Sequence, residues 1–284
     1  MSIMKLRCGN RILDLSTPQV MGVLNATPDS FSDGGDYALL NAGMTRAQQM
    51  FEQGAAIIDV GGESTRPGAI KVPVQQELDR VIPLVEKIGA QLDVCISVDS
   101  SSPQVMLAAK EAGAHIINDV RALQRDGAIV ACKQSKLPVC LMHMQGEPDT
   151  MQLNPSYDQI LDDVYGFLSS RIKACTDAGI DHDQLLIDPG FGFGKSVAHN
   201  YRMLARLDFF KALEVPILIG LSRKSMIAAV LNNCSVGDRL AGSLAGAVIA
   251  AMNGAHIIRV HDVKETVDAL SVVKATQQQF DARS

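Results

Sequence analysis

The chain has 284 residues, of which 47% are hydrophobic and 20% are charged, a composition typical of a globular protein. Its formal net charge of −5 argues against nucleic acid or an anionic membrane surface as a partner. No stretch approaches the ~18 apolar residues of a membrane span, and residues 1–7 lack the apolar core of a signal peptide. We therefore expect a cytoplasmic protein that acts on small molecules.

The cysteines are scattered, without a CxxC pair or the spacing of metal ligands. Most of them lie in apolar stretches, which predicts reduced thiols in a core rather than disulfides or a zinc site. They are Cys8, Cys95, Cys132, Cys140, Cys175 and Cys234.

The first predicted element is a short β-hairpin at about residues 4–15, with a turn at Gly9-Asn10. Apolar strand segments follow at residues 20–24, 56–60, 94–98, 115–118, 138–142, 185–188, 217–220 and 255–260. Helical patterns separate them, at about 42–53, 74–88, 103–112, 125–134, 157–178, 199–212, 239–252 and 263–279. Ser102-Pro103 marks a helix start with an N-cap hydroxyl, and Pro83 predicts a kink or break in its helix.

Strands that alternate with helices in this way indicate an α/β protein. We predict one domain over residues 1–284, a (β/α)₈ TIM barrel with the N-terminal hairpin at one end. An open doubly wound sheet is the alternative. In a barrel the reactive groups gather at the C-terminal ends of the strands, so the residues that follow each strand are the test for a site.

Polar or ionisable residues follow every predicted strand, whereas the opposite strand ends are mostly small, apolar or proline. This asymmetry favours a working site over chance. The residues at the C-terminal ends include Asn25, Asp59, Asp99, Asn118, His143, Asp188, Ser222, Lys224, Arg259 and His261.

Three of these residues, Asp99, Asn118 and Asp188, suit a flat heterocycle with several N–H groups. A carboxylate can accept two parallel hydrogen bonds from an amino group and an adjacent ring N–H. Each residue taken alone could instead cap the helix that follows its strand.

Positive charge forms a second set, Arg66, Lys224, Arg259 and His261, which suits a diphosphate. Asn25 could share a Mg²⁺ ion with phosphate oxygens. Any one of the cations could simply be solvated at the surface, and His261 could be structural. His143 lies between two methionines, which favours packing in the core or behind the residues that contact a ligand.

Two loops, residues 26–40 and 61–72, are rich in Gly, Ser and Asp, and they suit either water-excluding lids or plain surface loops. The glycines of residues 190–194 resemble a dinucleotide-binding fingerprint only superficially. Phe191 and Phe193 between them suit a wall beside an aromatic substrate.

Residues 25–35 (Asn-x-Thr-Pro-Asp-Ser-Phe-x-Asp-Gly-Gly) and 58–68 (Ile-Asp-x-Gly-Gly-Glu-Ser-Thr-Arg-Pro-Gly) resemble the two signature segments of the dihydropteroate synthase family. Segments 97–99, 117–119, 188–195, 222–224 and 259–262 match later motifs of that family in the same order. The resemblance covers nearly the whole chain.

The resemblance implies a TIM-barrel transferase of folate biosynthesis, with Mg²⁺ as cofactor. Such an enzyme condenses 4-aminobenzoate with 6-hydroxymethyl-7,8-dihydropterin diphosphate and releases 7,8-dihydropteroate and diphosphate. The resemblance also implies a homodimer and a target of sulfonamides.

Residue roles follow from the same resemblance. The pterin is expected at Asp99, Asn118, Asp188, Lys224 and Arg259, and the diphosphate at Asn25, Arg259 and His261, with Asn25 also on the metal. The aminobenzoate is expected at Thr65, Arg66, Pro67, Phe193 and Ser222. The residues expected to be catalytic are Asp99, Lys224 and Arg259.

Three other functions are compatible with parts of this pattern. A pterin-binding methyltransferase would lack the diphosphate cluster, and Asn25, Arg66 and His261 argue against it. A silent pterin-binding scaffold should have lost Asp99, Lys224 or the Arg259/His261 pair. A phosphosugar aldolase would use Lys224 as a Schiff-base lysine.

Overall fold

The computed structural model describes residues 4–26, 36–63, 72–146, 151 and 155–281. Parallel strands form one sheet in the order β8-β7-β6-β5-β4-β3-β10-β9. A parallel bridge between Ile187 and Ile217 joins the two outer strands, so the sheet curves into a barrel. The prediction of a TIM barrel is confirmed, and the open doubly wound sheet is wrong. The barrel strands are β3 (Gln19–Asn25), β4 (Ile57–Gly61), β5 (Cys95–Asp99), β6 (Ile116–Asp119), β7 (Val139–Met142), β8 (Leu185–Asp188), β9 (Leu218–Ile219) and β10 (Ile257–Val260).

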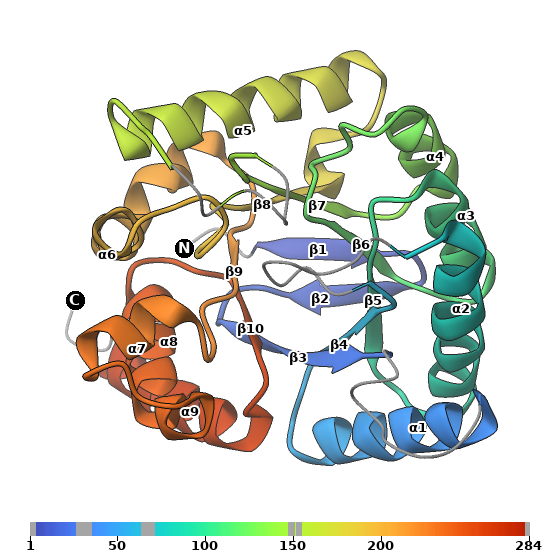
Figure 1. Ribbon diagram of the computed structural model, residues 1–284, viewed down its shortest axis with the longest axis horizontal. Helices are drawn as coiled ribbons and strands as arrows, with labels where there is room; N and C mark the ends of the chain where they lie inside the picture. The colour runs from blue at the N-terminus through green and yellow to red at the C-terminus, as the bar shows by residue number, and fades with distance from the viewer. Residues whose placement is uncertain (1–3, 27–35, 64–71, 147–150, 152–154, 282–284) are drawn as a thin grey trace.

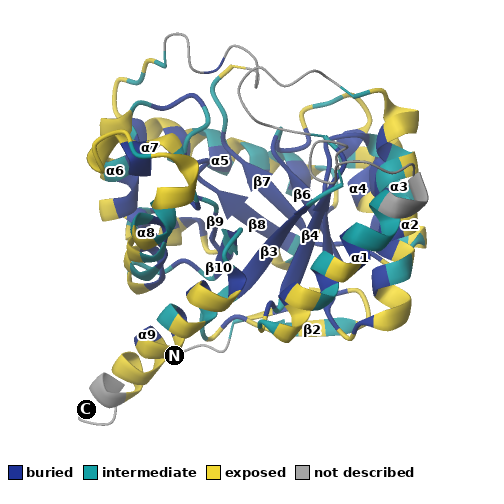
Figure 2. Ribbon diagram, turned by 60° about the horizontal axis from the view of Figure 1, so that its bottom comes forward, coloured by how far each residue is buried: buried dark blue, intermediate teal, exposed yellow. Residues whose placement is uncertain are grey.

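Helices surround the strands (Figure 1). They present buried side chains to the barrel and exposed side chains to solvent (Figure 2). The α-helices are α1 (Asp36–Glu52), α2 (Val74–Gln91), α3 (Pro103–Glu111), α4 (Ala128–Ser135), α5 (Ile160–Asp177), α6 (Val197–Ala205), α7 (Ser225–Val230), α8 (Leu240–Met252) and α9 (Val263–Asp281). The predicted helix at 199–212 is in fact two pieces, because α6 ends at Ala205 and a 3₁₀ helix, η3 (Leu207–Leu213), follows. Helix α7 was not among the predicted elements.

Two local predictions need correction. Of the kink or break predicted at Pro83, the break is absent, because helix α2 runs through Pro83 without interruption. Pro83 and Asp79, whose carbonyl loses its donor, are both exposed, and water can hydrate that carbonyl. Ser102 does occupy the N-cap of α3, but its hydroxyl donates to the Gln104 side chain at 3.1 Å and does not cap the backbone.

The barrel interior begins with an apolar layer to which every barrel strand contributes one residue. Hairpin strands β1 (Lys5–Cys8) and β2 (Arg11–Asp14) pack beneath it, and Leu6, Cys8 and Leu15 join the same buried cluster. The hairpin therefore plugs the N-terminal end of the barrel. The layer consists of Met21, Ile57, Cys95, Ile116, Cys140, Leu186, Leu218 and Ile257.

Because side chains alternate along a strand, the residue two positions later also faces the interior. In five strands that next residue is polar or charged: Asp59, Ser97, Asn118, Asp188 and Arg259. The interior thus changes from apolar at the hairpin end to polar at the C-terminal end.

Truncating the plug should destabilise the fold without touching the polar end. Leu6 is 1% exposed, so Leu6→Ala is expected to cost about 2–5 kcal/mol in the free energy of unfolding. Ile12→Ala on the neighbouring strand is the control, because Ile12 is 64% exposed. Urea denaturation of both variants measures the difference, and equal losses would contradict a plugging role for Leu6.

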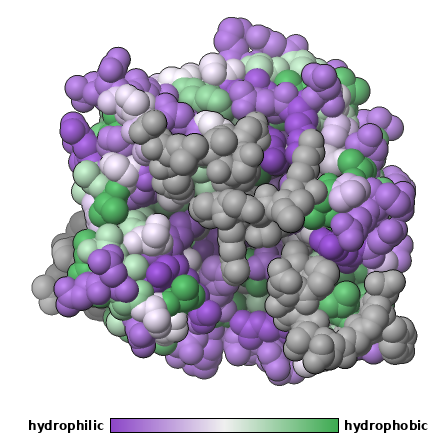
Figure 3. All heavy atoms as spheres, viewed as in Figure 1, coloured by the Kyte–Doolittle hydropathy of each residue, from purple (hydrophilic) through white to green (hydrophobic). Residues whose placement is uncertain are grey.

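All six cysteines are unpaired, and only Cys234 is not buried, in agreement with the predicted core thiols. Within the described ranges, no helix combines the length and apolar character needed to cross a bilayer. Many of the described side chains around the rim of the face seen in Figure 1 are hydrophilic (Figure 3).

Candidate active site

Four predicted site residues lie at the C-terminal ends of barrel strands. Asp99, Asn118 and Asp188, on β5, β6 and β8, are buried, and the side chain of Arg259 on β10 is 21% exposed. None of the three acceptors is an N-cap. The N-caps of α3, α4 and α6 are instead Ser102, Gly127 and Ser196. The helix-capping alternative for the acceptor residues is therefore wrong.

Arg259 lies between two carboxylates. Its Nε donates to Asp59 Oδ2 at 2.6 Å, and its Nη2 donates to Asp99 Oδ2 at 2.9 Å. Asn118 Nδ2 donates to the same Asp59 oxygen at 3.1 Å. Burial acts to lower the pKa of Arg259, but Asp59 and Asp99 outweigh burial and raise it, so the guanidinium stays charged.

Asp59 was noted at a strand end but was given no role in the predicted site. It is fully buried on β4, and its Oδ1 accepts no hydrogen bond from the described part of the chain. A carboxylate within the apolar segment 57–60 is itself a signal, because a buried charge needs a partner. Its partner Arg259 lies 200 positions further along the chain, so the sequence could not pair them.

Burial raises the pKa of the Asp99 carboxyl, although the charge of Arg259 opposes the shift. Burial also raises the pKa of Asp188, whose Oδ1 accepts from the Gly190 amide at 2.7 Å. The two groups are thus easier to protonate than ordinary aspartates. A buried carboxylate binds a hydrogen-bond donor well, because the donor replaces the hydrogen bonds to water that burial removes.

Lys224 lies in the loop between β9 and α7. Its Nζ is 4.2 Å from the centroid of the Phe193 ring, and it donates to the carbonyl of Phe191. Burial lowers the pKa of Lys224 to about 8, although Asp188 opposes the shift. Phe193, expected beside the aminobenzoate, therefore contacts a residue expected beside the pterin.

The residues expected to bind diphosphate lie on neighbouring strands, since Asn25 ends β3 and His261 follows β10, which pairs with β3. His261 Nδ1 lies 3.1 Å from Ser222 Oγ. This contact places an aminobenzoate candidate beside a diphosphate candidate. Thr65, Arg66 and Pro67 lie outside the described residues, as do the central parts of loops 26–40 and 61–72.

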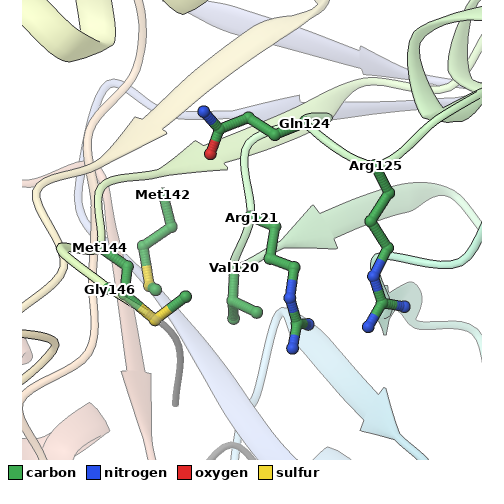
Figure 4. A pocket seen from close by; sticks show the side chains of 7 residues that line it. All are labelled: Val120, Arg121, Gln124, Arg125, Met142, Met144 and Gly146. Atoms are coloured by element: carbon green, nitrogen blue, oxygen red, sulfur yellow. The ribbon is translucent and has the colours of Figure 1, made fainter. Parts of the chain in front are cut away.

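A cavity of about 110 Å³ adjoins the acceptor residues without including them. Met142 pairs with Asp188 across β7 and β8, and Val120 follows Asn118 by two positions. In Figure 4 the Arg121 and Arg125 side chains extend in one direction, and the two methionines lie together on the opposite side. Apolar Val and Met carry no sequence signal for a site, so they were not predicted. The cavity is lined by Val120, Arg121, Gln124, Arg125, Met142, Met144 and Gly146.

Residues 21–261 match the pterin binding enzyme family. Dihydropteroate synthase of Escherichia coli is 56% identical over 273 residues, which cover 96% of each chain. Among solved structures, Yersinia pestis dihydropteroate synthase in a sulfonamide drug complex has a TM-score of 0.92 at 53% identity, covering 97% of this chain and all of the other. Xanthomonas albilineans dihydropteroate synthase in complex with 7,8-dihydropteroate has a TM-score of 0.88 at 47% identity, covering 96% of this chain and 98% of the other.

This similarity extends over the whole barrel and its strand-end residues. The protein described by this sequence and this structure belongs to the dihydropteroate synthase family of pterin-binding enzymes.

Proposed function

We propose that this protein is a dihydropteroate synthase, which joins 4-aminobenzoate to 6-hydroxymethyl-7,8-dihydropterin diphosphate. The observation that carries the proposal is the ring of acceptors Asp99, Asn118 and Asp188 beside Arg259 at one end of the barrel. The relative in Xanthomonas albilineans was solved with 7,8-dihydropteroate, the expected product.

The pterin is placed against the buried acceptors. Asp99 and Asp188 accept hydrogen bonds from the amino and ring N–H groups, while Asn118 both donates and accepts. Lys224 donates from the rim above Phe193. Because these groups are buried, their hydrogen bonds discriminate strongly against heterocycles that lack the matching donors.

The diphosphate is placed against Arg259, His261 and Asn25. In the described residues, no group of three or more His, Cys, Asp or Glu side chains could hold a metal. A single amide oxygen from Asn25 nevertheless fits Mg²⁺, which is commonly held by one or two protein ligands, water and substrate phosphates. When bound, Mg²⁺ would neutralise charge on the departing diphosphate.

We infer a dissociative substitution. The C–O bond to diphosphate breaks first, and the Asp99 carboxylate stabilises the positive charge left on the pterin methylene. The uncharged arylamine nitrogen then forms the C–N bond and loses a proton to solvent. Aminobenzoate is placed beside Phe193 and Ser222, with Thr65, Arg66 and Pro67 as its other contacts. Trapping experiments in which diphosphate never leaves without aminobenzoate would contradict this order.

A bell-shaped dependence of kcat/KM on pH is expected, because Asp99 must be ionised and Lys224 protonated. Burial raises the pKa of Asp99, so the acid limb lies above the range of an ordinary aspartate and activity rises with pH through it. Activity falls again near pH 8 as Lys224 loses its proton. Lys224→Arg should move that alkaline limb to higher pH; an unmoved limb would exclude Lys224 as its origin.

A cytoplasmic homodimer is also part of the proposal. Helices α7 and α8 and the segment between them expose apolar side chains, including Val230 at 57%, Val236 at 53% and Met252 at 63%. Such a surface favours burial against a second copy. Sedimentation should give twice the 30.4 kDa mass of one chain, and a monomer at micromolar concentration would refute the dimer.

The decisive experiment mixes the purified protein with both substrates and Mg²⁺ and measures dihydropteroate and diphosphate. Chelation of Mg²⁺ should suppress the reaction, and Mg²⁺ addition should restore it. Methyl transfer with a corrinoid partner would favour the methyltransferase, and Schiff-base trapping by borohydride would favour the aldolase. Binding of pterin without any product would favour the silent scaffold.

A further inference from the structure

One buried lysine at the edge of the site has no role in the reaction proposed above. Lys195 lies in the loop between β8 and α6 and is 3% exposed. Its Nζ donates to the carbonyls of Gly190 and Phe193, each at 2.9 Å, and lies 2.8 Å from His143 Nδ1. Burial lowers the pKa of Lys195, whereas the charge of Asp188 opposes the shift. Three acceptors around Nζ match the three N–H donors of an ammonium group.

His143 is fixed as the acceptor in this contact. Burial and the charge of Lys195 lower the pKa of His143 to about 3, which leaves the ring neutral. Its Nδ1 therefore accepts from Lys195, and its proton lies on Nε2. Phe167 packs edge-on against the ring, with centroids 4.9 Å apart. Lys195 thus joins the end of β7 to the loop after β8.

The two loops pack backbone against backbone at this point. Gly190 has φ +73°, and a Cβ there would lie 1.9 Å from the His143 carbonyl oxygen. Gly194 has φ +61°, and a Cβ there would lie 2.5 Å from the Gln145 carbonyl oxygen. Lys195 Nζ donates to the His143 carbonyl at 3.3 Å and to the Gly190 carbonyl at 2.9 Å, so it links the two loops. Buried carbonyls need a hydrogen-bond donor, and loss of the Lys195 donors would loosen the contact.

The loop that Lys195 fixes carries groups on both sides of the site. The Phe193 amide donates to the Gly190 carbonyl at 3.2 Å and closes a turn, and the Gly190 amide donates to Asp188 at 2.7 Å. The Phe193 ring lies beneath the ammonium of Lys224. The strand holds Asp188 in place, whereas Phe193 depends on the turn.

We propose that Lys195 is a positioning residue that fixes the 190–193 turn, and with it the Phe193 ring, before 4-aminobenzoate binds. The inference rests on the proposed function, because it assigns Phe193 to the aminobenzoate side of the site. Lys195 itself touches neither substrate.

Lys195→Met keeps the length of the side chain and removes its donors. We expect KM for 4-aminobenzoate to rise about tenfold or more, the scale of a lost charge-assisted hydrogen bond. KM for the pterin diphosphate should change less, because its acceptors lie on strands. Tyr157→Phe is the matched control, since the Tyr157 hydroxyl holds the same loop only through the Gly194 carbonyl, at 2.7 Å. That variant should leave both KM values unchanged.

A double-mutant cycle separates positioning from a general loss of structure. If Lys195 acts through Phe193, Lys195→Met should have little further effect on aminobenzoate KM in a Phe193→Ala background. Equal rises in both KM values, or additive effects in the cycle, would overturn the proposal. An unchanged aminobenzoate KM would overturn it as well.

Hydrogen exchange of the unmodified protein gives a test that does not depend on the folding of a variant. The amides of Gly190, Gly192 and Phe193 all donate hydrogen bonds and should exchange slowly without substrates. Rapid exchange that slows only on substrate binding would refute a turn fixed in advance. Failure of the unmodified protein to form dihydropteroate would refute the proposed function instead, so the two failures are distinguishable.

Discussion

Asp99→Asn is expected to lower kcat by about 10²–10³-fold, the scale of losing one group that stabilises transition-state charge. The amide has nearly the shape of the carboxylate but cannot offset the positive charge that develops on the pterin methylene. Arg259 should keep its orientation, because its Nε still donates to Asp59 at 2.6 Å. Pterin affinity should therefore fall much less than turnover.

Single-turnover rates and equilibrium binding of the pterin, measured side by side, test this expectation. Asp188→Asn provides the matched control, since Asp188 is proposed to bind the pterin without stabilising the reaction centre. It should raise KM for the pterin more than it lowers kcat. Equal losses of turnover and pterin affinity in Asp99→Asn would contradict the catalytic assignment.

Arg259→Ala is expected to weaken binding of the pterin diphosphate by roughly 2–3 kcal/mol, since a hydrogen bond to a charged group is lost. The same change should have little effect on a pterin without diphosphate. Calorimetric titration of both compounds measures the difference. Arg259→Lys keeps the charge but cannot reach both carboxylates, so an intermediate affinity is expected. Unchanged affinity for the diphosphate would remove Arg259 from the site.

Stability should change in parallel, because Arg259→Ala leaves Asp59 and Asp99 buried without their cation. Breaking a buried pair in this way typically costs about 3–5 kcal/mol. Arg259 opposes the rise in the pKa of Asp99, so in the variant the pKa of that carboxyl should rise further in the folded state. The loss of stability is therefore small at acid pH and grows as pH rises. Urea denaturation at two pH values checks the sign, and a larger loss at the acid pH would contradict it.

Sequence patterns predicted the barrel well because its strands are short apolar segments bounded by polar residues. The pattern failed at Pro83, where helix α2 continues because the missing hydrogen bond faces water. The pattern also predicted α6 and η3 as one helix, because both carry apolar residues at helical spacing. The backbone changes direction at Arg206, with φ −123°, but nothing in the composition indicates this change.

Site residues were predictable wherever a polar side chain directly follows an apolar strand, as with Asp188 and Arg259. Asp59 and Lys195 were given no predicted role, although each is buried and ionisable. The importance of each depends on its partners in the folded chain. Asp59 pairs with Arg259, and Lys195 contacts the loop carbonyls and His143. Whether the chain forms one domain over all 284 residues stays a prediction.

The sequence by itself determined the order of strands and helices and the polar residues at the strand ends, because local periodicity sets which side chains face a core. Only the tertiary structure decided that Asp59 and Asp99 share one arginine and that Lys195 joins two loops. Closure of the barrel brings these residues together from distant positions, and no local pattern encodes a contact between strands that far apart.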